Sequence, residues 1–233
     1  MTRPAKFLAE VNCTASAAMS AWAPMAERYV VSVFLDLRGY TAFCESAGLA
    51  DIVLLLACFR RRVELAAELF GGVVEGYAGD GAAVFFISDG KHAAAESAAL
   101  NFAQMVRDDL GALRRGTDTE HGAATMLPVS IGVAAGLAAV GRLHGTASVG
   151  LSVVSRGNNL ASRLSVMAAP DEIWVDAAIA DEHVTRFANS LEPAQRLSVR
   201  GLSNAISVRS LAPNYEASRA VITVRESMGS IPR

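Results

Sequence analysis

One stretch near the start of the sequence constrains the fold more than any other. It spans residues 29–43 and reads YVVSVFLDLRGYTAF. The apolar, β-branched residues 30–35 predict a buried strand that ends at Asp36, and a glycine turn then leads into a helix. A carboxylate at the end of a core strand can hold a hard cation, and the N–H groups of a first helical turn can face phosphate oxygens. The stretch therefore predicts a site for a metal-bound phosphate.

A second stretch supplies a matching carboxylate. Residues 73–78 and 82–87 are apolar runs joined by Gly79-Asp80-Gly81, which predicts a β-hairpin with Asp80 at its tip. If the hairpin lies beside the first strand, Asp36 and Asp80 converge and can share two metal ions.

The composition is typical of a globular protein with a substantial core. The 233 residues suggest one domain with extensions, or at most two small domains, and 52% of them are hydrophobic. The net charge of -2 and the lack of a long basic run argue against nucleic acid as a partner. The three cysteines have neither disulfide nor zinc spacing, which favours a reducing compartment.

The sequence predicts a cytoplasmic protein. Its apolar runs stop well short of the roughly 20 residues that a membrane-spanning helix needs. The first 28 residues make a poor signal peptide, because Asn12 and Pro24 interrupt their alanine-rich pieces.

The order of predicted elements indicates the fold. We expect a helical extension over residues 1–28, a domain over residues 29–212 and a tail over residues 213–233. Within the domain, helices are predicted to end at Gly71 and to span residues 92–113 and 157–167. Further strands are predicted at residues 128–135, 137–142, 171–176, 196–201 and 206–211. This order fits an α/β (α+β) fold: a ferredoxin-like palm domain with a mixed, mostly antiparallel sheet and helices packed on it.

Five short motifs occur in one order across this domain. They are FLDLRGYT at residues 34–41, GDG at 79–81, SIGVAAG at 130–136, NNLASR at 158–163 and VRGLSN at 199–204. Each motif alone is weak, but together they are specific. Over about residues 30–211 the chain resembles the catalytic domain of class III nucleotide cyclases.

The resemblance implies a two-metal reaction on a nucleoside triphosphate. The ribose 3′ oxygen attacks the α-phosphorus and expels pyrophosphate, with two divalent ions, Mg²⁺ or Mn²⁺, as cofactors. Asp36 and Asp80 match the family's metal carboxylates, and the carbonyl of Leu37 would be a backbone ligand. The phosphates would be bound by the N–H groups of Arg38, Gly39, Tyr40 and Thr41, and by the side chain of Arg200.

The resemblance also implies a dimer. Asn159 and Arg163, four residues apart on one face of a helix, match the pair that orients the ribose and stabilises charge on the α-phosphate. In the family this pair and the metal carboxylates come from different subunits. A head-to-tail homodimer with two shared sites is therefore expected.

The positions that read the base depart from the family pattern. Adenylate cyclases usually have a lysine at the position of Gly76 and an aspartate or threonine at that of Ser152, and Arg156 stands where an aspartate is common. Guanylate cyclases usually have glutamate at the Gly76 position. Strand alternation should turn the adjacent Glu75 to the opposite face, unless a one-residue bulge restores it. Gly76, Ser152 and Arg156 are the base-reading candidates.

These departures resemble the pyrimidine cyclases of bacterial anti-phage systems, which make cyclic UMP or cyclic CMP for a separate effector. A pyrimidine cyclase is therefore the favoured function. One alternative is an adenylate cyclase with unusual base contacts, and another is an inactive cyclase-like binding module. Taken singly, Asp36 could be a helix cap and Asp80 a turn residue, so the functional interpretation depends on both aspartates together with Asn159 and Arg163.

Overall fold

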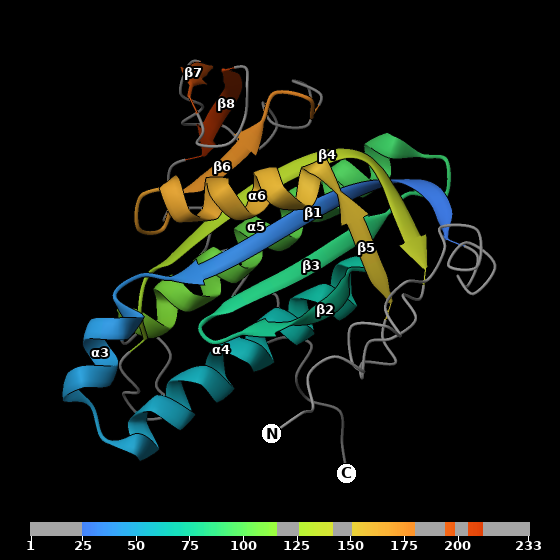
Figure 1. Ribbon diagram of the computed structural model, residues 1–233. Helices are drawn as coiled ribbons and strands as arrows, with labels where there is room; N and C mark the ends of the chain where they lie inside the picture. Colours follow the sequence, from blue (N-terminus) through green and yellow to red (C-terminus); the bar gives the residue numbers. More distant parts are fainter. Residues whose placement is uncertain (1–24, 116–125, 142–150, 180–193, 199–204, 212–233) are drawn as a thin grey trace, which may run out of the picture.

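The computed structural model describes residues 25–115, 126–141, 151–179, 194–198 and 205–211. These residues contain eight strands, which form one sheet, and four helices (Figure 1). The strands are β1 (Ala26–Leu37), β2 (Val73–Ala78), β3 (Gly81–Ile87), β4 (Val129–Gly141), β5 (Ser152–Ser155), β6 (Ile173–Asp176), β7 (Gln195–Leu197) and β8 (Ile206–Leu211). The helices are α3 (Tyr40–Ser46), α4 (Leu49–Phe70), α5 (His92–Arg114) and α6 (Arg156–Met167).

Strand β1 lies inside the sheet and pairs along both edges. The strand order is β2-β3-β1-β4-β6-β8-β7, and β5 pairs with β4 off this path. Among the described strands only β4 and β6 run parallel to each other, and every other pair is antiparallel. The sheet is thus mixed and mostly antiparallel, as the sequence predicts.

The two faces of β1 contact different helices, because successive side chains of a strand point to opposite faces. Val31, Val33 and Leu35 are buried in a core that includes Phe59 of α4 and Phe102 of α5. Ser32 points to the other face, where its hydroxyl donates to Asn158 Oδ1 of α6 over 2.8 Å. Figure 1 shows α6 on one side of β1 and β4, with α5 on the other.

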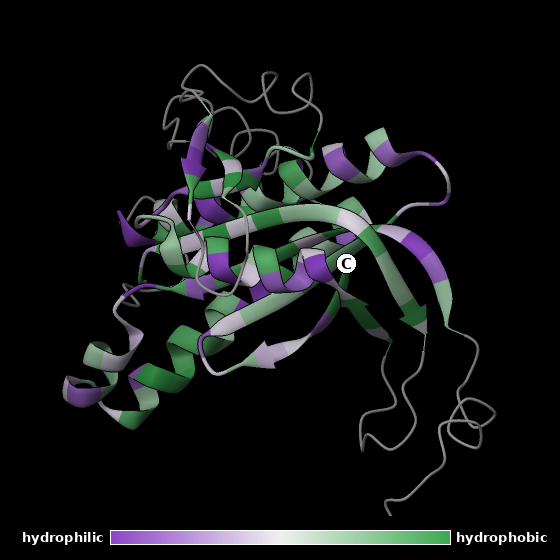
Figure 2. Cartoon of the chain, turned by 45° about the horizontal axis from the view of Figure 1, so that its top comes forward, coloured by the Kyte–Doolittle hydropathy of each residue, from purple (hydrophilic) through white to green (hydrophobic). Residues whose placement is uncertain are grey.

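Helix α4 begins with exposed hydrophobic residues. Leu49, Val53 and Leu54 are 78%, 60% and 48% exposed, and Figure 2 shows this hydrophobic stretch at the lower left. The helix ends at Phe70, because Gly71 follows with φ of 72° and its N–H donates to the Ala67 and Glu68 carbonyls. The helices in the described part of the chain include none whose length and apolar character would let it cross a membrane.

Two sequence-based expectations need correction. The predicted strand pair around Gly136 is a single strand, β4, which pairs with β1 from Leu37 opposite Val129 to Ala26 opposite Val140. Gly136 continues this strand because its backbone pairs with Val30 and no turn interrupts the ladder. Strand β1 also begins at Ala26, earlier than the predicted start at residue 30. The expected extension and tail lie almost wholly outside the described residues.

Helix α6 packs closely on β4, and a glycine makes that close packing possible. A Cβ atom on Gly132 would overlap the Ala161 carbonyl oxygen and the Ser165 amide nitrogen, and would lie 2.8 Å from Leu164 Cβ. The helix backbone thus lies directly on the backbone of the strand.

Gly132→Ala should lower stability, because α6 would have to move off the sheet to admit the methyl group. We expect a loss of about 1–3 kcal/mol, with Tm falling about 2–4 °C for each kcal/mol, as measured by thermal unfolding. Gly136→Ala is the matched control, since a Cβ on this residue of the same strand meets nothing within 4 Å. Equal Tm values for the two variants would contradict the close packing.

Candidate active site

Two carboxylates meet at the end of β1. Asp36 pairs with Gly81 in the β1–β3 register, and Asp80 directly precedes Gly81. Gly79 and Asp80 form the two-residue turn of the hairpin, and Gly79 has φ of 61°, which favours glycine. The negative charge of Asp80 raises the pKa of Asp36. The predicted convergence of the two aspartates is therefore present.

The environment of Asp36 is unfavourable for an isolated negative charge. Burial raises the pKa of its carboxyl most, the charge of Asp80 raises it further, and Arg38, whose Nη1 lies 3.6 Å from Asp36 Oδ2, lowers it. A divalent cation would relieve the repulsion, and carboxylate oxygens are the donors that Mg²⁺ and Mn²⁺ prefer.

The donor set fits such an ion only in part. The described residues contain no group of three or more His, Cys, Asp or Glu side chains that could hold a metal. Two carboxylates must therefore be supplemented by backbone carbonyls, water or substrate oxygens. Leu37, the last residue of β1, is adjacent to Asp36, and its carbonyl as a ligand stays a prediction.

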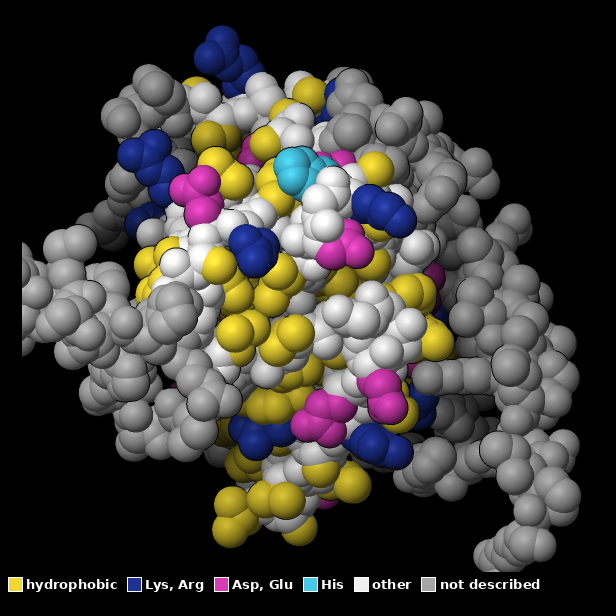
Figure 3. Space-filling model, turned by 90° about the vertical axis from the view of Figure 1, so that its right-hand side faces the viewer, with side chains coloured by type: hydrophobic (Ala, Val, Ile, Leu, Met, Phe, Trp, Pro, Cys, Tyr) yellow, Lys and Arg dark blue, Asp and Glu magenta, His cyan; other side chains and the backbone are white. Residues whose placement is uncertain are grey.

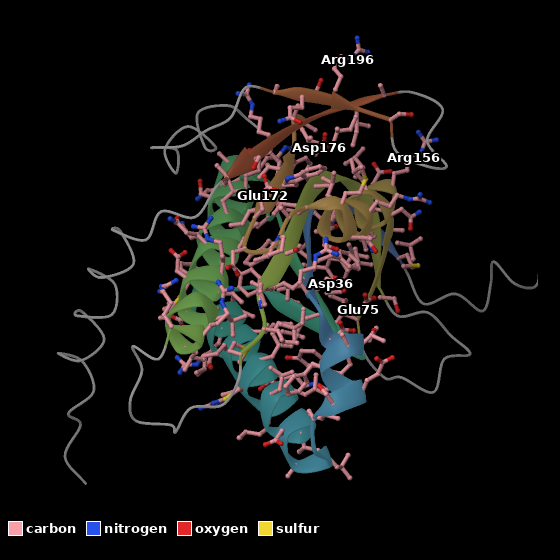
Figure 4. All side chains as sticks on the ribbon, turned by 90° about the vertical axis from the view of Figure 1, so that its left-hand side faces the viewer. Asp36, Glu75, Arg156, Glu172, Asp176 and Arg196 are labelled. Carbon is pink, nitrogen blue, oxygen red and sulfur yellow. The ribbon has the colours of Figure 1, made fainter. Side chains whose placement is uncertain are left out.

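A cleft of about 460 Å³ lies beside these carboxylates, within the usual size range of small-molecule sites. Its walls come from β1, from the β2–β3 hairpin and from the C-terminal half of α6. Figure 4 shows Asp36 and Glu75 above α3, with Arg156 farther up. The polar side chains that line the cleft are those of Asp36, Glu75, Tyr77, Ser162 and Ser165.

Glu75 lies in the cleft because β2 contains a β-bulge. The register with β3 runs from Val74 opposite Val84 to Gly76 opposite Ala83, so Glu75 is the extra residue. The expectation that Glu75 faces away from Gly76 is therefore wrong, since both line the cleft. The expectation of regular alternation required an unbroken β2–β3 ladder, and the bulge becomes visible only in the three-dimensional pairing of the two strands.

The Glu75 carboxylate lies at the start of β5. Burial raises the pKa of this carboxyl, and a hydrogen bond from the Val153 backbone N–H lowers it by less. Ser152, a base-reading candidate, begins β5 and precedes Val153. Gly76 leaves open space, since a Cβ on it would meet nothing within 4 Å. Arg156 is exposed at the first position of α6.

The predicted phosphate site at the start of α3 has fewer available backbone N–H donors than the sequence suggests. Gly39 caps α3 with φ of 81°, and the first intrahelical bond runs from Phe43 N–H to its carbonyl. The N–H of Arg38 already donates to the Pro128 carbonyl over 2.8 Å. This leaves Gly39, Tyr40 and Thr41 as the predicted phosphate donors. Arg200 lies outside the described residues.

The predicted catalytic pair lies on α6. Asn159 is exposed and Arg163 is half-buried, four residues apart on one helix, and neither is among the described residues that line the cleft. Asn158 instead has a structural role: Ser32 and Ser155 donate to its Oδ1, and its Nδ2 donates to the Val153 carbonyl over 2.6 Å. Among the described residues, Asp36 lines the cleft, whereas Asn159 and Arg163 do not.

No protein-family model and no curated protein sequence matches the chain. Solved structures do. The fold is that of adenylyl and guanylyl cyclase catalytic domains. The adenylyl cyclase CyaB from P. aeruginosa matches with a TM-score of 0.70 and 20% identity, over 82% of this chain and 97% of that one. The guanylate cyclase domain of RhGC from Catenaria anguillulae, in complex with GTP, has a TM-score of 0.63 and 17% identity, over 81% and 99%. A dimeric guanylyl cyclase domain from Blastocladiella emersonii has a TM-score of 0.59 and 18% identity, over 83% and 99%.

Asp36→Asn should stabilise the metal-free protein. The folded state raises the pKa of Asp36. Below the ordinary aspartate pKa of about 3.9 the carboxyl is protonated, and its full contribution to the stability of the fold is present. As the pH rises through the raised pKa, the carboxyl becomes charged in its unfavourable folded environment, and this contribution is lost. The uncharged amide escapes this loss. In EDTA at pH 7 its Tm should exceed that of the wild type, by about 2–4 °C for each kcal/mol gained.

The advantage of Asp36→Asn should vanish below pH ~3.9, where the carboxyl is protonated in folded and unfolded chains alike. The variant should also lose the Tm increase that Mn²⁺ gives the wild type. The matched control is Asp89→Asn, at an exposed aspartate outside the cleft. A variant that keeps the Mn²⁺ response would contradict the metal site.

Proposed function

We propose that this protein is a nucleotidyl cyclase, which converts a nucleoside triphosphate into a 3′,5′-cyclic nucleotide and pyrophosphate. The observation that carries the proposal is the position of Asp36 opposite Gly81, and so beside Asp80, at the edge of a nucleotide-sized cleft. The shared cyclase fold supports it, and one neighbour of that fold was solved with GTP. The presence of all four predicted residues, Asp36, Asp80, Asn159 and Arg163, favours an enzyme over an inactive binding module.

The proposed roles follow the chemistry of each group. Asp36, Asp80 and the Leu37 carbonyl would hold two divalent ions. When bound, such ions lower the pKa of the attacking 3′ hydroxyl and neutralise the triphosphate. The N–H groups of Gly39, Tyr40 and Thr41 would donate to phosphate oxygens, with Arg200 a further phosphate ligand.

We propose that the site is completed in a head-to-tail homodimer. Asn159 would orient the ribose, and the Arg163 guanidinium would stabilise negative charge growing on the α-phosphate. The exposed position of Asn159 supports a contribution across an interface. So do Val166 and Met167 on the same helix, which are 60% and 41% exposed although apolar. Figure 3 shows that hydrophobic side chains also reach the surface on another face of the molecule.

The proposed substrate is a pyrimidine triphosphate, UTP or CTP, and the product a second messenger for a separate effector in anti-phage defence. This part of the proposal rests on the sequence, which lacks the adenine-reading lysine at Gly76 and the usual acid or threonine at Ser152. A carboxylate at Glu75 is compatible with it, because uracil N3–H and the cytosine amino group are both donors.

A second candidate substrate is GTP, and the bulge at Glu75 favours it. The bulge brings a carboxylate into the cleft beside the position where guanylate cyclases carry glutamate. Its two acceptor oxygens suit the neighbouring N1–H and amino donors of guanine. ATP would require new contacts, for which Ser152 and Arg156 are the candidates.

A turnover assay with Mn²⁺ and ATP, GTP, CTP or UTP tests the function. Mass analysis of the products should reveal a cyclic pyrimidine nucleotide. Asp80→Ala should lower kcat at least about a thousandfold, because it removes a metal carboxylate. Glu75→Ala separates the candidate substrates. If the Glu75 carboxylate reads guanine, this variant should lose turnover of GTP and of no other nucleotide. A folded dimer with no product from any nucleotide would contradict the cyclase function.

The shared sites can be tested with two inactive variants. Asp36→Asn and Asn159→Ala homodimers each lack part of both sites and should be inactive. A mixed dimer of the two has one complete site and should regain about half of wild-type activity. A mixed dimer of Asp36→Asn with Asp80→Ala is the control, since both variants lack the same half-site. If the mixed dimer of Asp36→Asn with Asn159→Ala is as inactive as the two homodimers, the sites are not shared.

A further inference from the structure

The side chain of Arg38 connects the metal carboxylate to the helix that carries Asn159 and Arg163. Its Nε donates to Ser130 Oγ of β4 over 2.6 Å, and its Nη1 lies 3.6 Å from Asp36 Oδ2. Its Nη2 donates to three carbonyl groups at the end of α6: Ser165 over 3.0 Å, Ala168 over 2.5 Å, and Val166.

These contacts supply hydrogen-bond donors to the carbonyl groups at the C-terminal end of α6. The last carbonyl groups of an α-helix have no intrahelical donor, and they form the negative end of the helix dipole. The Arg38 guanidinium places a positive charge and the two N–H groups of Nη2 among three such oxygens, although it belongs to a segment far away in the sequence. Its planar shape fits several acceptors at once, whereas a lysine ammonium is a single point donor.

The other end of α6 is attached separately. Asn158 joins the first turn of α6 to Ser32 of β1 and to the Val153 carbonyl of β5. Gly132 of β4 admits the middle of the helix. Residues of β1 and of the turn that follows it therefore hold α6 at both ends: Ser32 of β1 at the start, and Arg38, which also contacts Asp36, at the C-terminal end.

We propose that Arg38 is a positioning residue that fixes α6 relative to the Asp36 carboxylate. It holds the α6 wall of the cleft, where Ser162 and Ser165 lie, opposite Asp36. This inference rests on the proposed function. In the proposed dimer, Asp36 and α6 of one chain serve different sites, so Arg38 of each chain links the metal half of one site to the Asn159–Arg163 half of the other.

Hydrogen exchange of the metal-free protein tests the attachment itself. In Arg38→Met, the amides of the last turn of α6 should exchange at least about tenfold faster, because three carbonyls lose their donor. The first turn, held by Asn158, should be unchanged. Arg38→Lys should be intermediate, and Arg61→Met, at an exposed arginine of α4, should match the wild type. Unchanged exchange at the end of α6 in Arg38→Met would overturn the proposal.

Mixed dimers with a single complete site test the coupling. Placed in the Asp36→Asn chain, which supplies α6, Arg38→Met should lower kcat about tenfold or more at every Mn²⁺ concentration and change KM little. Placed in the Asn159→Ala chain, which supplies Asp36, it should instead shift the Mn²⁺ concentration needed for turnover. Equal losses in both placements would overturn the positioning role.

Failure of the proposed function gives a different result. If the mixed dimer without Arg38→Met is inactive, the shared-site cyclase is wrong. The exchange experiment still decides whether Arg38 holds α6, because it needs neither nucleotide nor metal.

Discussion

Every part of the candidate site depends on the pairing of β1 along both edges. The ladders with β3 and β4 fix which residues of β1 lie opposite the hairpin turn and opposite the start of β4. Alternation then divides its side chains between two layers, with Val31, Val33 and Leu35 in the core beneath. Ser32 and Asp36 fall on the other face, with α6. A slip of one residue would exchange the two sets, so folding and site geometry share one register.

The elements that sequence predicts well are those with a strong local signal. Residues 30–35 and the Gly79–Asp80 turn carry such signals, as does the Gly71 end of α4, and the structure contains all three. The convergence of Asp36 and Asp80 follows from them, because it needs only a hairpin placed beside the first strand. Roles implied by resemblance alone, such as those of Asn159 and Arg163, are located by the structure on α6 but not tested by it.

The features that sequence misses are set by contacts distant in the chain. Glycine is ambiguous in a strand, so Gly136 suggested a break, although pairing with Val30 keeps β4 continuous. The bulge at Glu75 arises from a mismatch between two strands, which neither strand encodes by itself. Arg38 occurs within a motif that predicts phosphate contacts, yet its side chain binds carbonyls about 130 positions along the chain.

The bulge in β2 has an evolutionary consequence. An ordinary substitution changes one side chain, but a bulge decides which of two neighbouring side chains enters the cleft. Deleting a single residue near Glu75 would restore alternation and turn that carboxylate away, without altering the chemistry of any remaining residue. In a pocket built on this edge strand, insertions and deletions can therefore change ligand preference as readily as substitutions, while the carboxylates at the end of β1 stay in place.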